Sequence, residues 1–260
     1  MSQKFIEGRI VGRRDHTNTL FSLQFDAPLA GFVAGQYCQV GLRLPLQGGA
    51  ADALPALVMR PYSLVNAPDE RPFEIVLTEV PATAGGVLTP ALMRLQVGDA
   101  VYISPLAYGY FSIPEVPGTE VLWGLATGTA NGALLSCLKT ELPWQKFRKV
   151  VLVHAVRTAA ELTYRDQVDH IDRTYPGRFQ YIPFVSREAH GGAMSGRIPA
   201  AIVDGSLEAR AGITLTAESA HCMICGNPKM VTDTLEVLKA RGLKKHRRKE
   251  AGQITTEAYW

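Results

Sequence analysis

Long apolar runs are absent from this 260-residue sequence, and cysteine is scarce, with four residues. No segment approaches the roughly 20 apolar residues that a bilayer-spanning helix needs. The opening stretch, MSQKFIEGRI, also lacks the apolar core of a secretory signal. We therefore expect a cytoplasmic protein that does not insert into membranes.

The cysteines do not suffice for a structural zinc centre. Cys222 and Cys225 form one C-x-x-C, but the second pair of ligands that zinc requires is missing. The surrounding AHCMICG is typical of a buried strand, which would point these two side chains to opposite faces. Cys38 and Cys137 stand in apolar, periodic settings typical of core residues. We predict no metal site, with a redox dithiol or a metal role for Cys222 and Cys225 as the minor alternative.

Charge of one sign is not in large excess, since the formal net charge is only +3. The segment RGLKKHRRKE (241–250) nevertheless carries six Lys or Arg residues against one acid. No nucleic-acid motif is present and aromatic residues do not interleave with these cations, which makes a nucleic-acid partner the least favoured. A solvated segment is the ordinary interpretation of such a run. The functional interpretations are an acidic partner protein or a membrane surface.

The first half of the sequence alternates apolar and polar residues in short pieces, which predicts an antiparallel barrel or sandwich. VLTPALMRLQVGD (87–99) interrupts this pattern and predicts a short helix, with Thr89 as cap and Pro90 at the first helical position. RLPLQGGAADALPA (43–56) is expected to be a long loop. The six predicted strands are FIEGRIVGRR, LFSLQFD, GQYCQVGLRL, RPYSLVN, FEIVLTEV and DAVYISP.

A boundary is expected in IPEVPGTE (113–120), giving domains at 1–115 and 116–260. Beyond it, strands alternate with helices, which predicts a parallel sheet covered on both faces. NPKMVTDTLEVLKARG is the clearest helix, with Asn227 as cap, Pro228 at the first position and Gly242 as stop. The predicted strands are VLWGLA, KVVLVHAV, FQYIPFVS and AHCMICG, and the other helical patterns are ALLSCLKTEL and TAAELTYRDQVDHIDRTY.

The strand RPYSLVN places a fixed positive charge, Arg60, on the same face as a flat aromatic ring, Tyr62. GGVLTPAL (85–92) opens a helix whose N–H groups and dipole suit a phosphate. A pyrophosphate beside Arg60 and a ring on Tyr62 describe a flavin dinucleotide in the first domain. A half-exposed edge strand is the alternative.

Ligands of open parallel sheets bind outside the carboxyl ends of the strands. TGT (127–129) follows the first strand there and could wrap a phosphate, although the three-glycine fingerprint is absent. No acid is expected at the tips of the second and third strands to hold a ribose hydroxyl. Arg157, Arg187 and Arg197 stand there instead, and arginines suit a 2′-phosphate. The second domain is therefore expected to bind NADP, with exposed arginines as the alternative.

These motifs, in this order, resemble a bacterial ferredoxin (flavodoxin)–NADP reductase, a member of the ferredoxin reductase flavoprotein family. The resemblance spans essentially the whole chain and implies an N-terminal antiparallel β-barrel for FAD and a C-terminal α/β domain for NADP. RPYS resembles the family's flavin motif, and VLT (87–89) its second flavin-phosphate segment. The tail ITTEAYW is similar to an aromatic tail that returns to the FAD. The implied FAD contacts are Arg60, Pro61, Tyr62, Ser63, Leu77, Thr78, Glu79, Val87, Leu88, Thr89, Thr129, Tyr259 and Trp260.

The resemblance also assigns NADP contacts, in VHAVR, SRE, SGRIP and CGNPKM. They are Val156, Arg157, Ser186, Arg187, Arg197, Asn227, Pro228 and Lys229. Ser63 and Cys225 are implied to shape the hydride pocket, and Tyr62 to tune the flavin by stacking. The loop TGTANGA departs from the family pattern at Asn131 and Ala133.

The implied activity is hydride exchange between NADP(H) and flavin N5, coupled to one-electron steps with ferredoxin or flavodoxin. The basic segment would then attract this acidic carrier, and a monomer is the expected state. The alternative enzyme is an NADPH-dependent reductase of free flavin or of an oxygenase component. A nucleotide-sensing module without turnover is the alternative from another class, and Asn131 is the one feature that favours it.

Overall fold

The computed structural model describes residues 5–45 and 54–258, which form two units, one ending at Gly109 and the other beginning at Tyr110. The first unit thus ends before the expected boundary at residue 115. Residues 113–115 form a 3₁₀ turn of the second unit. In the described ranges, every helix is too short or too polar to cross a membrane.

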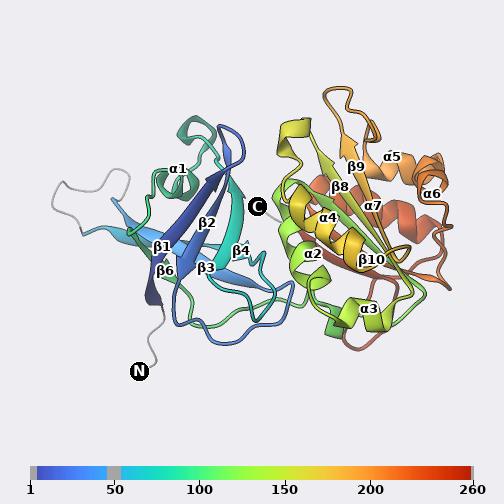
Figure 1. Cartoon of the computed structure of the whole chain (residues 1–260), viewed down its shortest axis with the longest axis horizontal. Coiled ribbons are helices and arrows are strands. Elements are labelled where there is room, and N and C mark those ends of the chain that lie inside the picture. The colour runs from blue at the N-terminus through green and yellow to red at the C-terminus, as the bar shows by residue number, and fades with distance from the viewer. Residues whose placement is uncertain (1–4, 46–53, 259–260) are drawn as a thin grey trace. The chain divides into compact units, whose positions relative to one another are not determined.

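The first unit is an antiparallel sheet that curls into a barrel (Figure 1). The strand order is β4-β3-β6-β1-β2-β5. A bridge between Leu64, just after β4, and Ile75 in β5 joins the two edges. The predicted barrel is therefore confirmed. Its strands in the described residues are β1 (Ile6–Asp15), β2 (Leu20–Asp26), β3 (Tyr37–Leu44), β4 (Ala56–Ser63), β5 (Phe73–Thr78) and β6 (Ala100–Ile103).

The alternation that predicts these strands also builds the barrel core. In β2, Phe21, Leu23 and Phe25 are fully buried because successive strand side chains point to opposite faces. The Phe25 ring lies 5.6 Å from that of Phe73 in β5, centroid to centroid. The core thus fixes β5 beside β2 and brings its last residue, Thr78, to the same barrel end as Leu20.

Two predictions in this unit need correction. The expected loop 43–56 is shorter, because β3 continues to Leu44 and β4 begins at Ala56; residues 46–53 of this loop lie outside the described part. The expected helix is α1 (Leu88–Leu92), which has Val87 at its N-cap position. The Thr89 hydroxyl instead accepts a hydrogen bond from the Val80 N–H, at 2.9 Å. Thr89 is therefore not the cap, and it ties α1 to the end of β5.

The second unit contains a parallel sheet with the strand order β11-β10-β7-β8-β9. Strand order reverses between β7 and β10, which are neighbours in space but not in sequence. Such a switch point is where ligands of open α/β sheets bind. The strands are β7 (Val121–Thr127), β8 (Lys149–Val156), β9 (Phe179–Val185), β10 (Ala220–Gly226) and β11 (Ile254–Ala258).

Helices cover both faces of this sheet, which explains why β7, β8 and β10 are continuous apolar runs (Figure 1). Trp123 and Leu125 of β7 share one core with α5, α6 and α7. Gly124 faces the other way, and the Leu134 side chain of α2 fills the space above it. The helices are α2 (Asn131–Leu138), α3 (Leu142–Lys146), α4 (Arg165–Thr174), α5 (Ile198–Val203), α6 (Ser206–Ala211) and α7 (Pro228–Ala240).

Most predicted elements of this unit are confirmed, and α7 most closely. The Asn227 side chain accepts hydrogen bonds from the Lys229 and Met230 N–H groups, so it is the predicted N-cap. Gly242 adopts the left-handed conformation that a helix stop favours. The helix predicted over 158–175 begins only at Arg165, after a 3₁₀ turn at Ala159–Glu161. The sequence pattern does not predict helices α3, α5 and α6 or strand β11.

Candidate functional site

In the first unit, β4 presents the charge and the ring that the sequence predicts. Arg60 is exposed, and its guanidinium donates to its neighbour's carbonyl oxygen on Met59, at 2.8 Å. No carboxylate of a described residue lies within ion-pair distance of it. Tyr62 is half-buried and packs on the barrel core. Burial raises the pKa of the Tyr62 phenol to about 12, so the ring stays neutral. A cation that has no carboxylate partner among the described residues thus lies beside a fixed aromatic surface.

Most of the implied FAD contacts around α1 are buried or half-buried. Leu77 and Leu88 lie in the barrel core, so these two positions can offer a ligand only their backbone groups. Thr78 and Glu79 are half-buried, and Val87 is exposed. Ser63 is half-buried and faces Tyr37 across the β3–β4 pair, and Pro61 is exposed.

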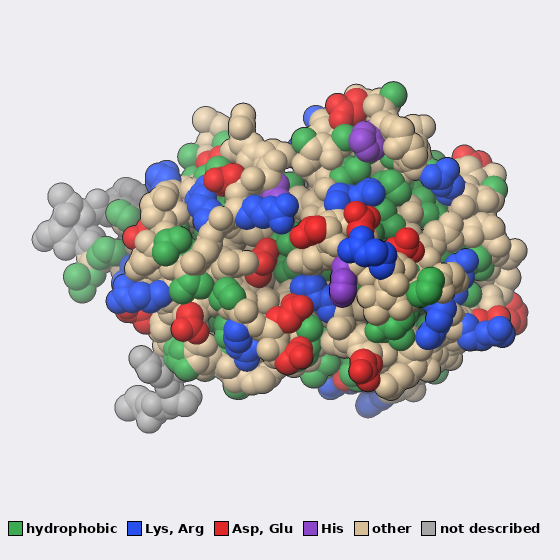
Figure 2. All heavy atoms as spheres, viewed as in Figure 1, with side chains coloured by type: hydrophobic (Ala, Val, Ile, Leu, Met, Phe, Trp, Pro, Cys, Tyr) green, Lys and Arg blue, Asp and Glu red, His purple; other side chains and the backbone are tan. Residues whose placement is uncertain are grey.

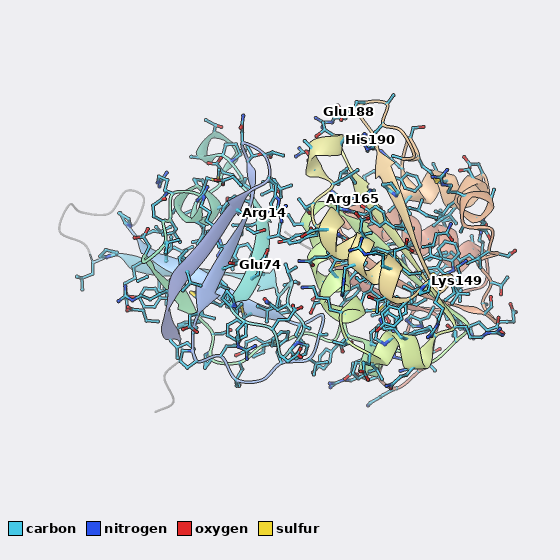
Figure 3. All side chains as sticks on the ribbon, viewed as in Figure 1. Arg14, Glu74, Lys149, Arg165, Glu188 and His190 are labelled. Atoms are coloured by element: carbon cyan, nitrogen blue, oxygen red, sulfur yellow. The ribbon has the colours of Figure 1, made fainter. Side chains whose placement is uncertain are left out.

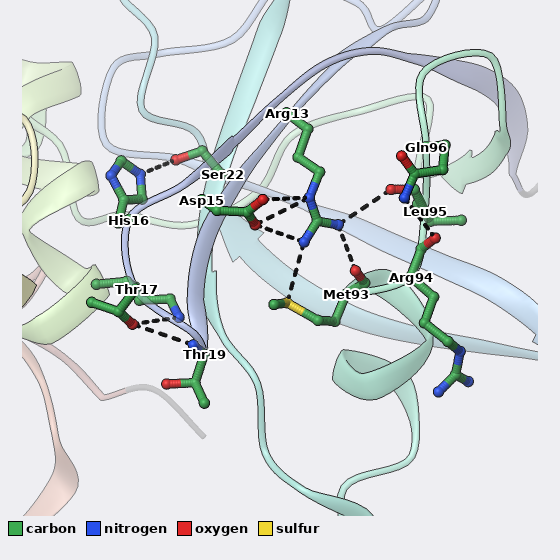
Figure 4. A network of polar contacts seen from close by, with 11 residues as sticks. Arg13, Asp15, His16, Thr17, Thr19, Ser22, Met93, Arg94, Leu95 and Gln96 are labelled. Carbon is green, nitrogen blue, oxygen red and sulfur yellow. Dashed lines mark hydrogen bonds and ion pairs between the residues drawn. The ribbon is translucent and has the colours of Figure 1, made fainter.

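Arg13 of β1 fixes the far end of α1 (Figure 4). Its guanidinium donates to the backbone oxygens of Met93 and Leu95 and forms an ion pair with Asp15. Cations near a helix C-terminus stabilise it. The Asp15 carboxyl in turn has a lowered pKa, mainly because Arg13 donates hydrogen bonds to it. The segment that follows β5 is therefore held at both ends, by Thr89 and by Arg13.

In the second unit, the ends of β7 and β10 touch at the switch point. Thr127 closes β7, and its hydroxyl accepts a hydrogen bond from the Asn227 N–H, at 2.9 Å. A Cβ on Gly226 would lie 2.2 Å from that hydroxyl and 2.9 Å from the Thr127 carbonyl oxygen. Gly226 also has φ = +129°, which L side chains rarely adopt. Glycine is thus required here, and it leaves backbone without a side chain beside the turn Gly128–Ala130, which carries Thr129.

The arginines at the strand ends are not equivalent, and one prediction is wrong. Arg157, which follows β8, forms an ion pair with Glu161 at 3.1 Å, and the Arg157 N–H donates to the same carboxylate. Glu188, after β9, accepts a hydrogen bond from the Ala159 N–H (labelled in Figure 3). Acids therefore do lie at the tips of the second and third strands. Neither acid follows its strand directly: Glu161 is five residues beyond β8 and returns through a turn, and Glu188 is three residues beyond β9.

Arg187 and Arg197 are the arginines at the strand ends that remain available to bind a ligand. Both are exposed, and neither is paired with a carboxylate of a described residue. Ser186 donates from its hydroxyl to the Val156 carbonyl oxygen, at 3.1 Å. The Val156 side chain packs with Leu162 and Val185, so only its backbone can face a ligand.

At the end of β10, the predicted residues are already engaged in the protein. Asn227 uses its side-chain oxygen as the α7 cap, which leaves its NH₂ group for a ligand. Lys229 is exposed and forms an ion pair with Asp233, at 3.0 Å. Pro228 occupies the first position of α7 and is half-buried.

The C-x-x-C pair behaves as the strand pattern predicts. Cys222 packs into the core shared with α7, and Cys225 lies three residues on, on the opposite face of β10. Both are fully buried. Burial raises the pKa of the Cys222 thiol. Among the described residues, no three His, Cys, Asp or Glu side chains are placed to hold a metal ion.

Glu257 is a candidate site residue that no sequence pattern indicates. It lies in β11 directly opposite Cys225, so it reaches the carboxyl end of the sheet beside the switch point. Its Oε2 atom is buried and has no hydrogen-bond partner among the residues that the structure describes. Burial raises the pKa of the Glu257 carboxyl to about 7. The tail Tyr259 and Trp260, predicted to contact FAD, lies outside the described residues.

The raised pKa predicts how stability depends on pH. The pKa of Glu257 rises from 4.5 to about 7 on folding, so its contribution is complete below pH 4.5 and is lost as the pH rises through 7. This loss is up to about 3 kcal/mol. Glu257→Gln removes it. The variant's melting temperature, relative to the natural protein, is therefore expected to increase from pH 5 to pH 9.

The control is Glu218→Gln, at an exposed position. A melting-temperature difference between Glu257→Gln and the natural protein that stays constant from pH 5 to pH 9 would contradict ionisation of Glu257 as the cause. A difference in packing alone would not depend on pH.

Comparison with known proteins places these features in one family. Residues 125–236 match the model of the oxidoreductase NAD-binding domain. The flavodoxin/ferredoxin–NADP reductase of Escherichia coli (strain K12) is 40% identical over 257 residues, which cover 98% of this chain and 99% of the relative. The chain belongs to the flavodoxin/ferredoxin–NADP reductase family.

Other relatives agree with this membership. The ferredoxin–NADP reductase of Pseudomonas aeruginosa is 30% identical, over 94% of this chain and 92% of the relative. A crystal structure of a ferredoxin NADP⁺ reductase from Neisseria gonorrhoeae, with bound FAD and NADP, matches with a TM-score of 0.87 and 28% identity, covering 99% of both chains. The two-unit fold, an antiparallel barrel and a parallel sheet, is therefore the fold of this reductase family, and the protein is an oxidoreductase.

Proposed function

We propose that the protein is an FAD-dependent reductase that exchanges electrons between NADP(H) and ferredoxin or flavodoxin. When bound, FAD exchanges hydride with NADP(H) at N5 and single electrons with the carrier. The observation that supports this most is the close contact of Gly226 with Thr127 at the switch point. It joins the ends of β7 and β10 where a pyridine nucleotide of this fold binds.

The residues of the first unit fit FAD. The guanidinium of Arg60 offers two parallel N–H donors to a pyrophosphate, and no described carboxylate competes for them. Tyr62 supplies a neutral ring for one face of the flavin, and Ser63 lies next along β4. The backbone of Leu77 to Glu79 and of Val87 to Thr89 would contact the phosphates, with Pro61, Thr129, Tyr259 and Trp260 as further contacts in this proposal.

The residues of the second unit fit NADP(H). Arg187 and Arg197 would bind the 2′-phosphate, and Ser186 with Arg157 and Val156 would line the same strand ends. The Asn227 amide, Pro228 and Lys229 would lie along the nicotinamide and ribose. Ser63 would contact the flavin near N5 and Cys225 would lie beside the nicotinamide, and hydride transfer needs no acid or base from the protein.

The test of the function is carrier-dependent turnover. NADPH-driven cytochrome c reduction is expected to accelerate strongly when ferredoxin or flavodoxin is added. Rapid reduction of free FMN with no response to either carrier would favour the alternative, a flavin reductase. No turnover with any acceptor would contradict the proposed function.

Arg187→Ala/Arg197→Ala is expected to lower the preference for NADPH over NADH by at least about 100-fold. Each substitution removes a guanidinium and its charge-assisted hydrogen bonds to the 2′-phosphate. These bonds contribute about 1.5 to 3 kcal/mol per group. The measurement is kcat/KM with each nucleotide. Arg157→Ala is expected to have a smaller effect, because Arg157 must leave Glu161 to reach a ligand. An unchanged preference in the double variant would remove these arginines from the site.

The acidic carrier is proposed to bind near residues 244–249. Lys244, Lys245, Arg247, Arg248 and Lys249 are all exposed, and the Arg248 guanidinium lies over the Tyr110 ring at 3.7 Å. On the face shown in Figure 2, by contrast, basic and acidic side chains are interspersed. The concentration of positive charge in residues 244–249 favours attraction of an acidic protein.

Arg247→Glu is therefore expected to raise the KM for the carrier roughly tenfold at low ionic strength. Salt screens exposed charges, so the variant and the natural protein should converge near 0.5 M salt. Arg173→Glu makes the same charge change at an exposed position in α4 and is the control. A KM for the carrier that changes neither with salt nor in Arg247→Glu would exclude residues 244–249 as the carrier-binding surface.

In this proposal the protein works as a cytoplasmic monomer. Its four buried cysteines agree with a reducing compartment. Cell fractionation and size-exclusion chromatography of the purified protein would test the two parts separately.

A further inference from the structure

A buried histidine holds the turn at the switch point from inside the sheet. His154 lies in β8, directly opposite Ala126 of β7, and is fully buried. Its Nε2 atom is 3.0 Å from the Gly128 carbonyl oxygen, and its Nδ1 atom is 3.2 Å from the Tyr181 hydroxyl. Both ring nitrogens therefore have partners, and one of them is the backbone of the turn.

These partners determine where the protons lie. A carbonyl oxygen only accepts, so His154 Nε2 must carry the hydrogen that is donated to Gly128. Burial is the main cause that lowers the pKa of His154, to about 4, so the ring is neutral and Nδ1 accepts a hydrogen bond. Burial raises the pKa of Tyr181 to about 12, so its hydroxyl keeps the proton that it donates.

The same chain of contacts reaches the surface of α4. The Arg165 guanidinium lies 5.0 Å from the centroid of the Tyr181 ring, and Arg165 is the first residue of α4 (labelled in Figure 3). A surface cation thus holds the tyrosine, the tyrosine orients the imidazole, and the imidazole holds the turn. The neighbouring arginine also disfavours a second positive charge on His154.

The turn needs such a restraint because Gly128, its first residue, has no side chain that could fix its conformation. Gly128 has φ = +56°, and the space around its missing Cβ is open. Its carbonyl oxygen accepts from the Asn131 N–H in addition to His154, so both lone pairs of that oxygen are used. The direction of this carbonyl sets the direction of the following peptide groups.

We propose that His154 is a positioning residue for the pyridine nucleotide: through Gly128 it fixes the turn that follows β7, and Tyr181 and Arg165 fix His154. The inference rests on the proposed function, in which a pyridine nucleotide binds at the switch point, where this turn follows β7. It assigns a role in NADP(H) binding to a residue that need not touch the nucleotide.

Two near-isosteric variants separate this role from packing. In His154→Gln the side-chain NH₂ can occupy the place of Nε2, so the bond to Gly128 is kept. In His154→Asn the shorter side chain reaches only the place of Nδ1, so that bond is lost. Losing one neutral hydrogen bond from a turn corresponds to an affinity change of up to about tenfold.

The measurement is the Kd for NADP⁺, from the difference spectrum of the flavin-loaded protein. His154→Asn is expected to raise Kd about tenfold and His154→Gln less than about threefold. The control is His221→Asn. His221 is fully buried too, but it lies near the start of β10 and forms a hydrogen bond with Thr255 rather than with the turn. The Kd of His221→Asn for NADP⁺ should therefore stay within about twofold of that of the natural protein. If the His154 variants do not fold, Tyr181→Phe, which removes one hydroxyl, is expected to raise Kd about threefold.

The outcomes are distinguishable. Equal Kd values for His154→Asn and His154→Gln, or as large an increase for His221→Asn, would overturn the positioning role alone. If the natural protein bound no NADP⁺, the proposed function would fail, and this inference would fail with it. In the histidine ring ¹⁵N spectrum, His154 is expected as the Nε2–H tautomer from pH 5 to 8, and the Nδ1–H tautomer would contradict the geometry.

Discussion

Arg60→Ala protein is expected to purify nearly colourless, with an affinity for FAD lowered about 100-fold. Charge-assisted hydrogen bonds to a phosphate contribute about 1.5 to 3 kcal/mol, and Arg60 has no carboxylate among the described residues to compete with the pyrophosphate. The measurement is the flavin-to-protein absorbance ratio, followed by titration of the apoprotein with FAD.

The control for Arg60 is Arg43→Ala. Arg43 is an exposed arginine of the same β3–β4 hairpin, and it lies over the Tyr102 ring rather than beside Tyr62. It should retain full flavin content. A yellow Arg60→Ala protein with unchanged affinity would mean that β4 is only an edge strand with a solvated charge.

Gly226→Ala is expected to lower NADPH-dependent reduction of the flavin at least 100-fold and to destabilise the protein by roughly 3 kcal/mol. The added Cβ meets both the hydroxyl and the backbone of Thr127 at the switch point, and the backbone conformation itself disfavours alanine. The flavin content should persist, since Gly226 belongs to the second unit. Stopped-flow reduction and thermal unfolding measure the two effects.

Two further variants test the cause. Gly212→Ala places a methyl group at another residue of positive φ, where nothing lies within 4 Å. It should cost about 1 kcal/mol and leave reduction by NADPH unchanged. Gly226→Ala combined with Thr127→Ala removes the nearest clashing atom and should recover part of the stability. Full activity in Gly226→Ala would show that the switch point does not contact the nucleotide.

The sequence predicts the elements whose pattern is local and complete. Helix α7 has its cap, its proline and its stop within the same short segment, so its ends are predictable. Strand β7 is apolar throughout because both faces are covered. Helices α5 and α6 have six residues each, too few to show a period. In β11 only Ile254 is buried, so its sequence shows no strand pattern and resembles a polar tail.

The site shows the same division. Arg60 and Tyr62 are predictable because strand alternation alone puts them on one face. The ion pair of Arg157 with Glu161 depends on a turn, and the place of Glu257 beside Cys225 depends on the pairing of β10 with β11. The contact of His154 with Gly128 depends on the register of β8 with β7. Interactions of this kind exist only once strands are paired, which a single sequence does not specify.

The most direct test is the visible spectrum of the purified protein, before and after addition of NADPH or NADH without oxygen. We expect flavin absorbance that bleaches rapidly with NADPH and barely with NADH. Equal bleaching by both nucleotides would contradict the roles of Arg187 and Arg197 but leave the flavin site intact. A protein that stays colourless after incubation with FAD would contradict FAD binding at Arg60 and Tyr62 and, with it, the proposed reductase activity.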